Sequence, residues 1–295
     1  MTNENQHIGA DPRPMILTPA DFADTGQWRL VIHVAADGMG AVLRHVSDTS
    51  RPAVRLFDDH WEPLEGRSLL ERIENSVYEH PGILDDYATE IVVTTPNTTW
   101  IPTEILSSGE FMEENVFNEF FPGENEVMTD RVGEATALFS LAPGFDGFMA
   151  RTVPGARMRS YLAVLAERML ADAGDGIFTI NIILYRSSVT LVASRGETLL
   201  CASEHPVTCK EDVSCVAKKV LDAFGEEGEA SLVNIFDFNG ATRFAEDLYM
   251  ELLDISHVRM RELPDTLTST SLSPAVAITV FKEVTLMTGF FGSEL

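Results

Sequence analysis

The stretch RLVIHVAADGMGAVLRHV, from Arg29 to Val46, decides the fold, because two apolar runs flank one short polar turn. The predicted turn spans the five residues from Ala36 to Gly40 and contains Asp37 and Gly38. Two apolar runs joined in this way predict a β-hairpin. An acidic residue beside two glycines at its tip fits a phosphate cradle, and it fits a simple turn equally well.

The pattern continues outward from the hairpin into a third strand, a helix and a fourth strand. The segment PAVRLFDDHW at 52–61 alternates as a strand does. Leu69, Ile73 and Val77 then recur at four-residue spacing among charged residues, which predicts an amphipathic helix. The run TEIVVTTPNTTWIP at 89–102 reads as one further strand, with an apolar centre typical of a strand buried on both faces.

The same order of elements recurs in the second half of the chain. Three strands are predicted within 177–206, then a helix over 208–225, then a strand over 232–238. Thr208 and Glu211 have capping-box spacing at the start of this helix, and its apolar face includes Val213 and Val220. Between the two halves, the segment 155–174 predicts a long helix. The strand-strand-strand-helix-strand order therefore occurs twice, which predicts an α/β protein of mixed sheets with helices on their faces. The expected division is a tail at 1–27, a first lobe at 28–175 and a second lobe at 176–295.

Charge narrows the classes of partner. The 295 residues carry 46 Asp and Glu against 21 Lys and Arg, a formal net charge of -25. Binding to phosphate backbones or anionic lipids depends on clustered basic residues, so we expect neither nucleic acid nor a membrane surface as partner. Solubility alone also explains an acidic surplus.

The chain shows no feature of export or membrane insertion. Its first residues lack a basic segment followed by an apolar core, so no signal peptide is expected, and no run of 18 uncharged apolar residues predicts a membrane span. Cys201, Cys209 and Cys215 are odd in number and suit neither a zinc knuckle nor a redox pair. We therefore expect reduced thiols and a cytoplasmic protein.

Four stretches carry a resemblance to a known group of proteins. They are residues 28–46, VVTTPNTTWIPTEIL at 92–106, GETLLCASEHPVTCKEDV at 196–213 and SLVNIFDFNG at 231–240. Over most of 28–290 the chain resembles a family of uncharacterised Bacteroidetes proteins with an actin-like ATPase fold. More distantly it resembles the actin-like protein of type IV pilus assembly, which binds a peptide from a membrane partner. The resemblance implies two ribonuclease-H-like lobes with a nucleotide cleft between them.

In active members of that group, two hairpin turns approach the phosphates, each with an aspartate followed by a glycine two residues on. The first turn here offers Asp37, Gly38 and Gly40, but the residue two before Gly38 is Ala36, so the aspartate is one residue out of register.

The two other nucleotide-contacting turns that the resemblance implies are also incomplete. The second turn has Ser187 and Ser188 with neither aspartate nor glycine, and the nucleoside turn keeps Asn239, Gly240 and Thr242. These eight positions are the expected remnant of a nucleotide site.

Other catalytic and metal motifs are not found. No GxSxG, HExxH, Walker or GxGxxG pattern occurs. Asp58, Asp59 and His60 are adjacent on a predicted strand, where neighbours point to opposite faces, so we expect no shared metal ion. Phe117, Phe120 and Phe121 stand among acidic residues and suit either a core cap or a protein interface.

Two hypotheses follow. The first is a non-catalytic actin-like protein that binds a protein partner, either another protein or a second copy of itself, and needs no cofactor. The alternative is an ATP-binding enzyme, an ATPase or a small-molecule kinase, that uses Asp37 with ATP and magnesium.

Overall fold

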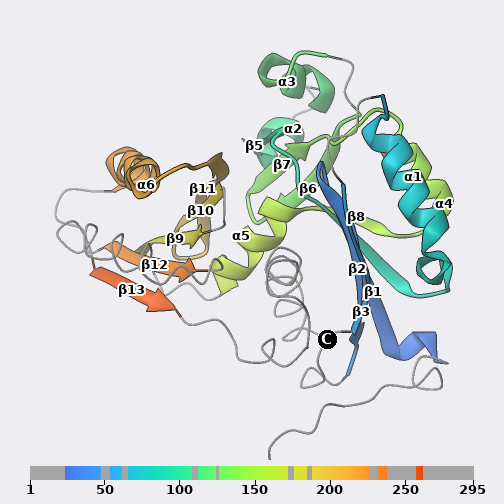
Figure 1. Ribbon diagram of the computed structural model, residues 1–295. Helices are drawn as coiled ribbons and strands as arrows, with labels where there is room; N and C mark the ends of the chain where they lie inside the picture. Colours follow the sequence, from blue (N-terminus) through green and yellow to red (C-terminus); the bar gives the residue numbers. More distant parts are fainter. Residues whose placement is uncertain are drawn as a thin grey trace, which may run out of the picture.

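The computed structural model describes residues 24–47, 54–61, 66–107, 112–123, 126–171, 176–184, 188–225, 231–237 and 257–261. Within them, two five-stranded mixed sheets and one three-stranded sheet form the framework (Figure 1). Residues 1–23 of the tail predicted at 1–27 lie outside the described residues. The sequence also predicts a helix beginning near Asn239 and a helix at the C-terminal end, and both of these lie outside the described residues as well.

The first sheet is built around the hairpin predicted from the sequence. Its order is β3-β2-β1-β4-β8, with β1 antiparallel to β2 and parallel to β4. A short 3-10 helix at Thr25–Gln27 precedes it. The strands are β1 (Trp28–Ala35), β2 (Gly38–His45), β3 (Val54–His60), β4 (Ala88–Val93) and β8 (Arg157–Ser160).

Helices cover both faces of this sheet. On one face α1 (Leu69–Glu79) and α4 (Phe145–Thr152) pack on alternate β1 residues such as Leu30 and Ile32, and a 3-10 helix (Pro81–Leu84) follows α1. Ser68 and Glu71 form a capping box at the start of α1. The hydrogen bonds that the Glu71 carboxylate accepts from Ser68 lower its pKa. On the opposite face lies α5 (Tyr161–Ala171).

A small subdomain is inserted between β4 and α4. Its sheet has the order β5-β7-β6 and rests on a core formed by Ile101, Phe117 and Leu138. The indole Nε1–H of Trp100 donates a 2.8 Å hydrogen bond to the carbonyl oxygen of Ala202, which links this subdomain to the second large sheet. The elements are β5 (Thr98–Pro102), α2 (Thr103–Ser107), α3 (Glu113–Phe120), β6 (Met128–Val132) and β7 (Ala135–Phe139).

The second large sheet repeats the topology of the first. Its order is β11-β10-β9-β12-β13, again with an antiparallel hairpin followed by parallel strands. Helix α6 (Lys210–Phe224) packs on one face through Val213 and Val220, on the stripe predicted from the sequence. The strands are β9 (Phe178–Leu184), β10 (Ser188–Arg195), β11 (Thr198–Pro206), β12 (Ser231–Asp237) and β13 (His257–Arg261).

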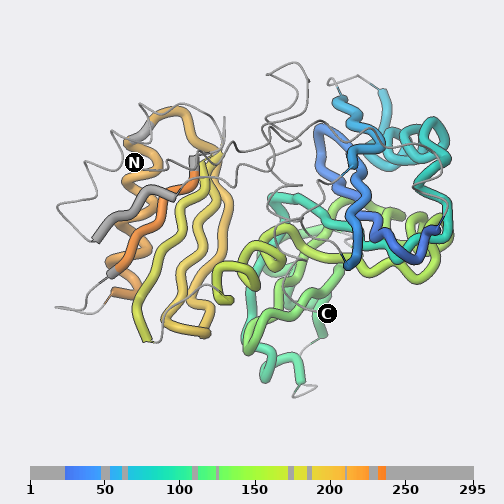
Figure 2. The backbone as a smooth tube through the Cα atoms, turned by 90° about the horizontal axis from the view of Figure 1, so that it is seen from below, coloured from blue at the N-terminus to red at the C-terminus, as the bar shows by residue number. Residues whose placement is uncertain are grey.

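Helix α5 lies between the two large sheets, as Figure 2 shows where the green helix separates the blue strands from the yellow and orange ones. One apolar cluster contains residues of both sheets together with α5, among them Val31, Val92, Ile183 and Val192. Because α5 contributes to this shared core, the domain limits of 28–175 and 176–295 stay a prediction.

Three local predictions are corrected. The helix predicted over 155–174 begins only at Tyr161, because 157–160 pair with β4 as strand β8. The single strand predicted over 89–102 is two strands of different sheets, separated around Pro96, which has no backbone N–H for a ladder. At α6 the first turn is capped by Asp212, which accepts from the backbone and hydroxyl of Thr208, rather than by the predicted Glu211.

Candidate functional site

The turn between β1 and β2 is shorter than predicted. It contains Ala36 and Asp37 alone, while Gly38 and Gly40 are residues of β2 paired with Ala35 and His33. The side chain of Asp37 is exposed, and its carbonyl oxygen accepts a 2.8 Å hydrogen bond from the backbone N–H of Trp61. The turn is therefore held by the chain following β3.

Gly38 is required by the close approach of β3. A Cβ atom placed on Gly38 would lie 2.6 Å from the carbonyl oxygen of Asp59, which is closer than real Cβ contacts come. The two strands pair here as Gly38 with His60 and Met39 with Asp59. Strand packing thus accounts for this glycine without a phosphate ligand.

Gly40 separates two polar side chains on the face that carries α5. His33, Gly40 and Asp58 are aligned across β1, β2 and β3. His33 is buried, and its Nε2 lies 2.9 Å from the Thr94 hydroxyl. Burial raises the pKa of Asp58, an effect that Arg55, 3.4 Å away, opposes.

Asp58 and Asp59 point to opposite faces of β3, as the strand geometry predicts. Asp58 shares its face with His33, whereas both carboxylate oxygens of Asp59 face the His80 ring at the end of α1. The three adjacent residues Asp58, Asp59 and His60 therefore do not converge on one point.

Part of the predicted nucleotide remnant lies outside the described residues, namely Ser187, Asn239, Gly240 and Thr242. Ser188 is described: it begins β10, and its hydroxyl donates to Glu204 at 2.8 Å. The described end of β12 reaches the same edge of the second sheet, because Leu184 of β9 pairs with both Asp237 and Val189. That the eight positions form one site stays a prediction.

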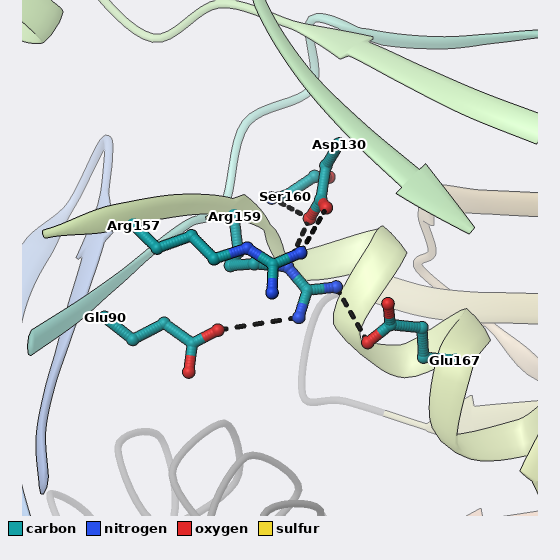
Figure 3. A network of polar contacts seen from close by, with 6 residues as sticks. All are labelled: Glu90, Asp130, Arg157, Arg159, Ser160 and Glu167. Atoms are coloured by element: carbon teal, nitrogen blue, oxygen red, sulfur yellow. Dashed lines mark hydrogen bonds and ion pairs between the residues drawn. The ribbon is translucent and has the colours of Figure 1, made fainter. Parts of the chain in front are cut away.

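A buried network of charges was not predicted from the sequence (Figure 3). Arg159 of β8 lies at its centre, with a side chain 3% exposed. Its Nε donates to Asp130 of β6 at 2.7 Å, its Nη2 lies 2.8 Å from Glu167 of α5, and its Nη1 lies 3.5 Å from Glu90 of β4. The backbone N–H of Ser160 also donates to Asp130, at 3.1 Å.

The electrostatics of this network favour a structural role, in which the ion pairs hold neighbouring elements together. Burial raises the pKa values of Asp130 and Glu90, and the nearby guanidinium of Arg159 opposes this. Burial lowers the pKa of Arg159, but Asp130 and Glu167 raise it by more, so the guanidinium stays charged. The network joins the first sheet, the inserted sheet and α5.

The inserted subdomain presents an acidic surface with exposed apolar side chains. Met112 and Phe120, at the two ends of α3, are 64% and 60% exposed. Phe117 is fully buried, and the ring of Phe121 lies against it in a tilted arrangement, with 4.9 Å between the ring centroids. Phe117 and Phe121 thus belong to a core, as the first expectation has it, whereas Phe120 is exposed. That Phe120 belongs to a protein interface stays a prediction.

Charge around these apolar residues is of one sign. Between Arg72 and Arg131 the sequence contains no Lys or Arg, and every charged residue there except His80 is Asp or Glu. Exposed glutamates lie on the same helices α2 and α3: Glu104, Glu113, Glu114 and Glu119. The length of this base-free stretch is a signal that was readable in the sequence.

Two mixed sheets of identical topology, with helices on their faces, define an actin-like ATPase fold. The structure is similar to a Bacteroides thetaiotaomicron protein with an actin-like ATPase fold and unknown function, with a TM-score of 0.67 and 18% identity over 82% of this chain and 93% of that one. This confirms the resemblance drawn from the sequence and, at that identity, shows the fold alone.

Two further solved structures are similar. One is the PilM–PilN type IV pilus biogenesis complex, with a TM-score of 0.49 and 13% identity over 89% of this chain and 97% of that one. The other is the ethanolamine utilization protein EutJ of Carboxydothermus hydrogenoformans, with a TM-score of 0.44 and 7% identity over 89% of each chain. No protein-family model and no curated protein matches the chain. Among the described helices, none has both the length and the apolar character of a membrane span.

Proposed function

We propose that this protein is a non-catalytic member of the actin-like fold that acts in the cytoplasm by binding another protein. The proposed function requires neither ATP nor magnesium. Its support at the β1–β2 turn is chemical: Ala36 stands where the resemblance requires an aspartate, and Gly38 is accounted for by the approach of β3.

The observation that carries the proposal is the surface of α2 and α3, which we call the acidic apolar surface. It consists of Ile105, Met112 and Phe120 together with the exposed glutamates of both helices. Both helices belong to the inserted subdomain, and α3 lies at the top of the molecule in Figure 1. Exposed aromatic and methionine side chains are typical anchors of protein interfaces, and the surrounding carboxylates select the sign of the partner's charge.

The partner that fits this surface is a basic segment with apolar side chains at helical spacing. Lys and Arg on its polar face would complement the glutamates, and its apolar face would cover Met112 and Phe120. A second copy of this chain fits less well, because two copies of the surface would bring carboxylates of the same sign together. We therefore assign the surface to a different protein.

Selection from a displayed library of random helical peptides tests this assignment. With the full chain as target, we expect binders enriched in Lys and Arg and carrying apolar residues, with affinity that falls as salt is raised. The double change Met112→Ser with Phe120→Ser should weaken binding by about tenfold or more, because a buried anchor contributes roughly 1–2 kcal/mol or more.

The matched control is Tyr78→Ser, because Tyr78 of α1 is 72% exposed and belongs to another part of the surface. It should leave peptide binding unchanged. Binders without basic enrichment, or binders indifferent to the double change, would refute the acidic apolar surface. So would a dimer of this chain, seen by light scattering, that the same double change dissociates.

A further inference from the structure

A set of metal-ligating side chains lies where β3 meets the end of α1, on the face of the first sheet opposite α5. Asp59 comes from β3, Glu79 is the last residue of α1 and His80 follows it. The ligand atoms of the three residues lie within 4.8 Å of one another. Two of the three positions are adjacent in sequence, and the third comes from a strand some twenty residues earlier.

The imidazole of His80 is held in one orientation. Its Nε2 lies 3.0 and 3.1 Å from the two carboxylate oxygens of Asp59. Phe57, two residues before Asp59, stacks on the His80 ring at 4.0 Å between centroids and 7° between planes. The His80 backbone N–H also closes α1 by donating to Ser76. A ring fixed by stacking and by the helix end presents the same nitrogen to Asp59 without further ordering.

The position of Asp59 depends on the opening hairpin. Asp59 pairs with Met39 of β2, and the adjacent Gly38 lets the backbone of β3 come close enough for this pairing. Met39 is buried in the core on this face, so the strand is anchored beneath the carboxylate. The glycine that the sequence offered as part of a phosphate cradle thus places a carboxylate on the other face of the sheet.

The donor set is one imidazole nitrogen and two carboxylates. We propose that Asp59, Glu79 and His80 bind a divalent transition-metal ion, with Zn²⁺ as the preferred candidate. Nitrogen and carboxylate donors without thiolate suit Zn²⁺ and its neighbours in the first transition row. Ligands about 2.0–2.1 Å from an ion in tetrahedral arrangement lie roughly 3.3–3.4 Å apart, close to the distance that separates His80 from Asp59.

Glu79 distinguishes a metal site from a simple ion pair. Asp59 and His80 alone would form a simple hydrogen-bonded pair at the C-terminal end of a helix. A third ligand that is exposed and negatively charged adds nothing essential to that pair, but it completes the three protein ligands of an open zinc site. The remaining position would be left for water or for a group of a bound molecule. The ion would also clamp the end of α1 to β3.

Calorimetric titration of the full chain with Zn²⁺ tests the proposal. We expect one site with a stoichiometry near one that is lost in His80→Gln and weakened about tenfold or more in Glu79→Gln. Because Zn²⁺ also binds thiolates, the same titrations are made after the three cysteines have been alkylated, and the site should persist. Zn²⁺ should raise the melting temperature of the unchanged protein, since it binds the folded chain.

The control is His60→Gln, one residue beyond Asp59 on the same strand and outside the ligand set. It should leave the titration unchanged. Zn²⁺ heat that is unaffected by Glu79→Gln, or that disappears on alkylation, would overturn the proposal, as would the absence of saturable binding. Because Glu79 is exposed, its change to Gln keeps the test valid even if His80→Gln unfolds the chain.

Discussion

Replacing Arg159 with Met should destabilise the protein by about 3–5 kcal/mol, because it leaves the buried carboxylates of Asp130 and Glu90 without their cation. The side chain of Asp130 is 2% exposed and has Arg159 as its nearest charged partner at 2.7 Å. Methionine keeps most of the apolar stem of arginine, so the loss of stability reflects the missing charge rather than a change in side-chain volume. Denaturant unfolding at pH 7 measures it as a shift in midpoint.

The loss should shrink as pH falls. Burial already raises the pKa of Asp130, and removing Arg159 removes the main opposing effect. A carboxyl with a raised folded pKa contributes stability that is fully present below its unfolded pKa and lost as pH rises through the folded pKa. The variant should therefore approach the unchanged protein in acid.

Arg157→Met is the matched control for this prediction. Arg157 lies on the same strand and reaches Asp130 at 3.7 Å, but its side chain is 65% exposed. Such a surface pair contributes less than about 1 kcal/mol. Equal losses in the two variants, or a loss in Arg159→Met independent of pH, would contradict the assignment of Arg159 as the buried centre of the network.

Replacing Gly38 with Ala should cost roughly 1–3 kcal/mol, the range for forcing an extra carbon into a packed region. The new Cβ would meet the backbone carbonyl of Asp59 at 2.6 Å, and a backbone atom in a paired strand has little freedom to move away. Thermal or denaturant unfolding measures the effect.

Gly82→Ala serves as its control, because nothing lies within 4 Å of a Cβ at that position. It should be neutral or slightly stabilising, since alanine restricts the unfolded chain more than glycine does. If Gly38→Ala proved equally neutral, strand packing would no longer explain Gly38, and the phosphate-cradle interpretation of the hairpin would regain support.

Much of the fold was readable from periodicity and order. The hairpin at β1 and β2, the helix from Leu69 and the repeat beginning near Phe178 all carry patterns that depend on local neighbours. Strand β8 was missed because its four residues precede α5 directly and share its apolar spacing. Only pairing with β4, more than sixty residues away, makes them a strand.

The site was less accessible to sequence reasoning. Asp130 lies 29 residues and Glu90 lies 69 residues before Arg159 along the chain. No local sequence pattern indicates contacts over such separations. His80 and Asp59 are likewise brought together only by the packing of α1 on β3. The acidic apolar surface was not predicted either, but the sequence contains a signal for it, the long stretch without Lys or Arg. Charge of one sign over consecutive elements can be recognised from the local sequence alone.

Titration of the full chain with ATP and magnesium, followed by a phosphate-release assay, tests the central claim that this actin-like fold is non-catalytic. We predict no heat beyond dilution and no phosphate beyond a protein-free blank. Micromolar ATP binding with turnover, both removed by Asp37→Ala, would contradict the claim and establish the ATP-dependent enzyme instead.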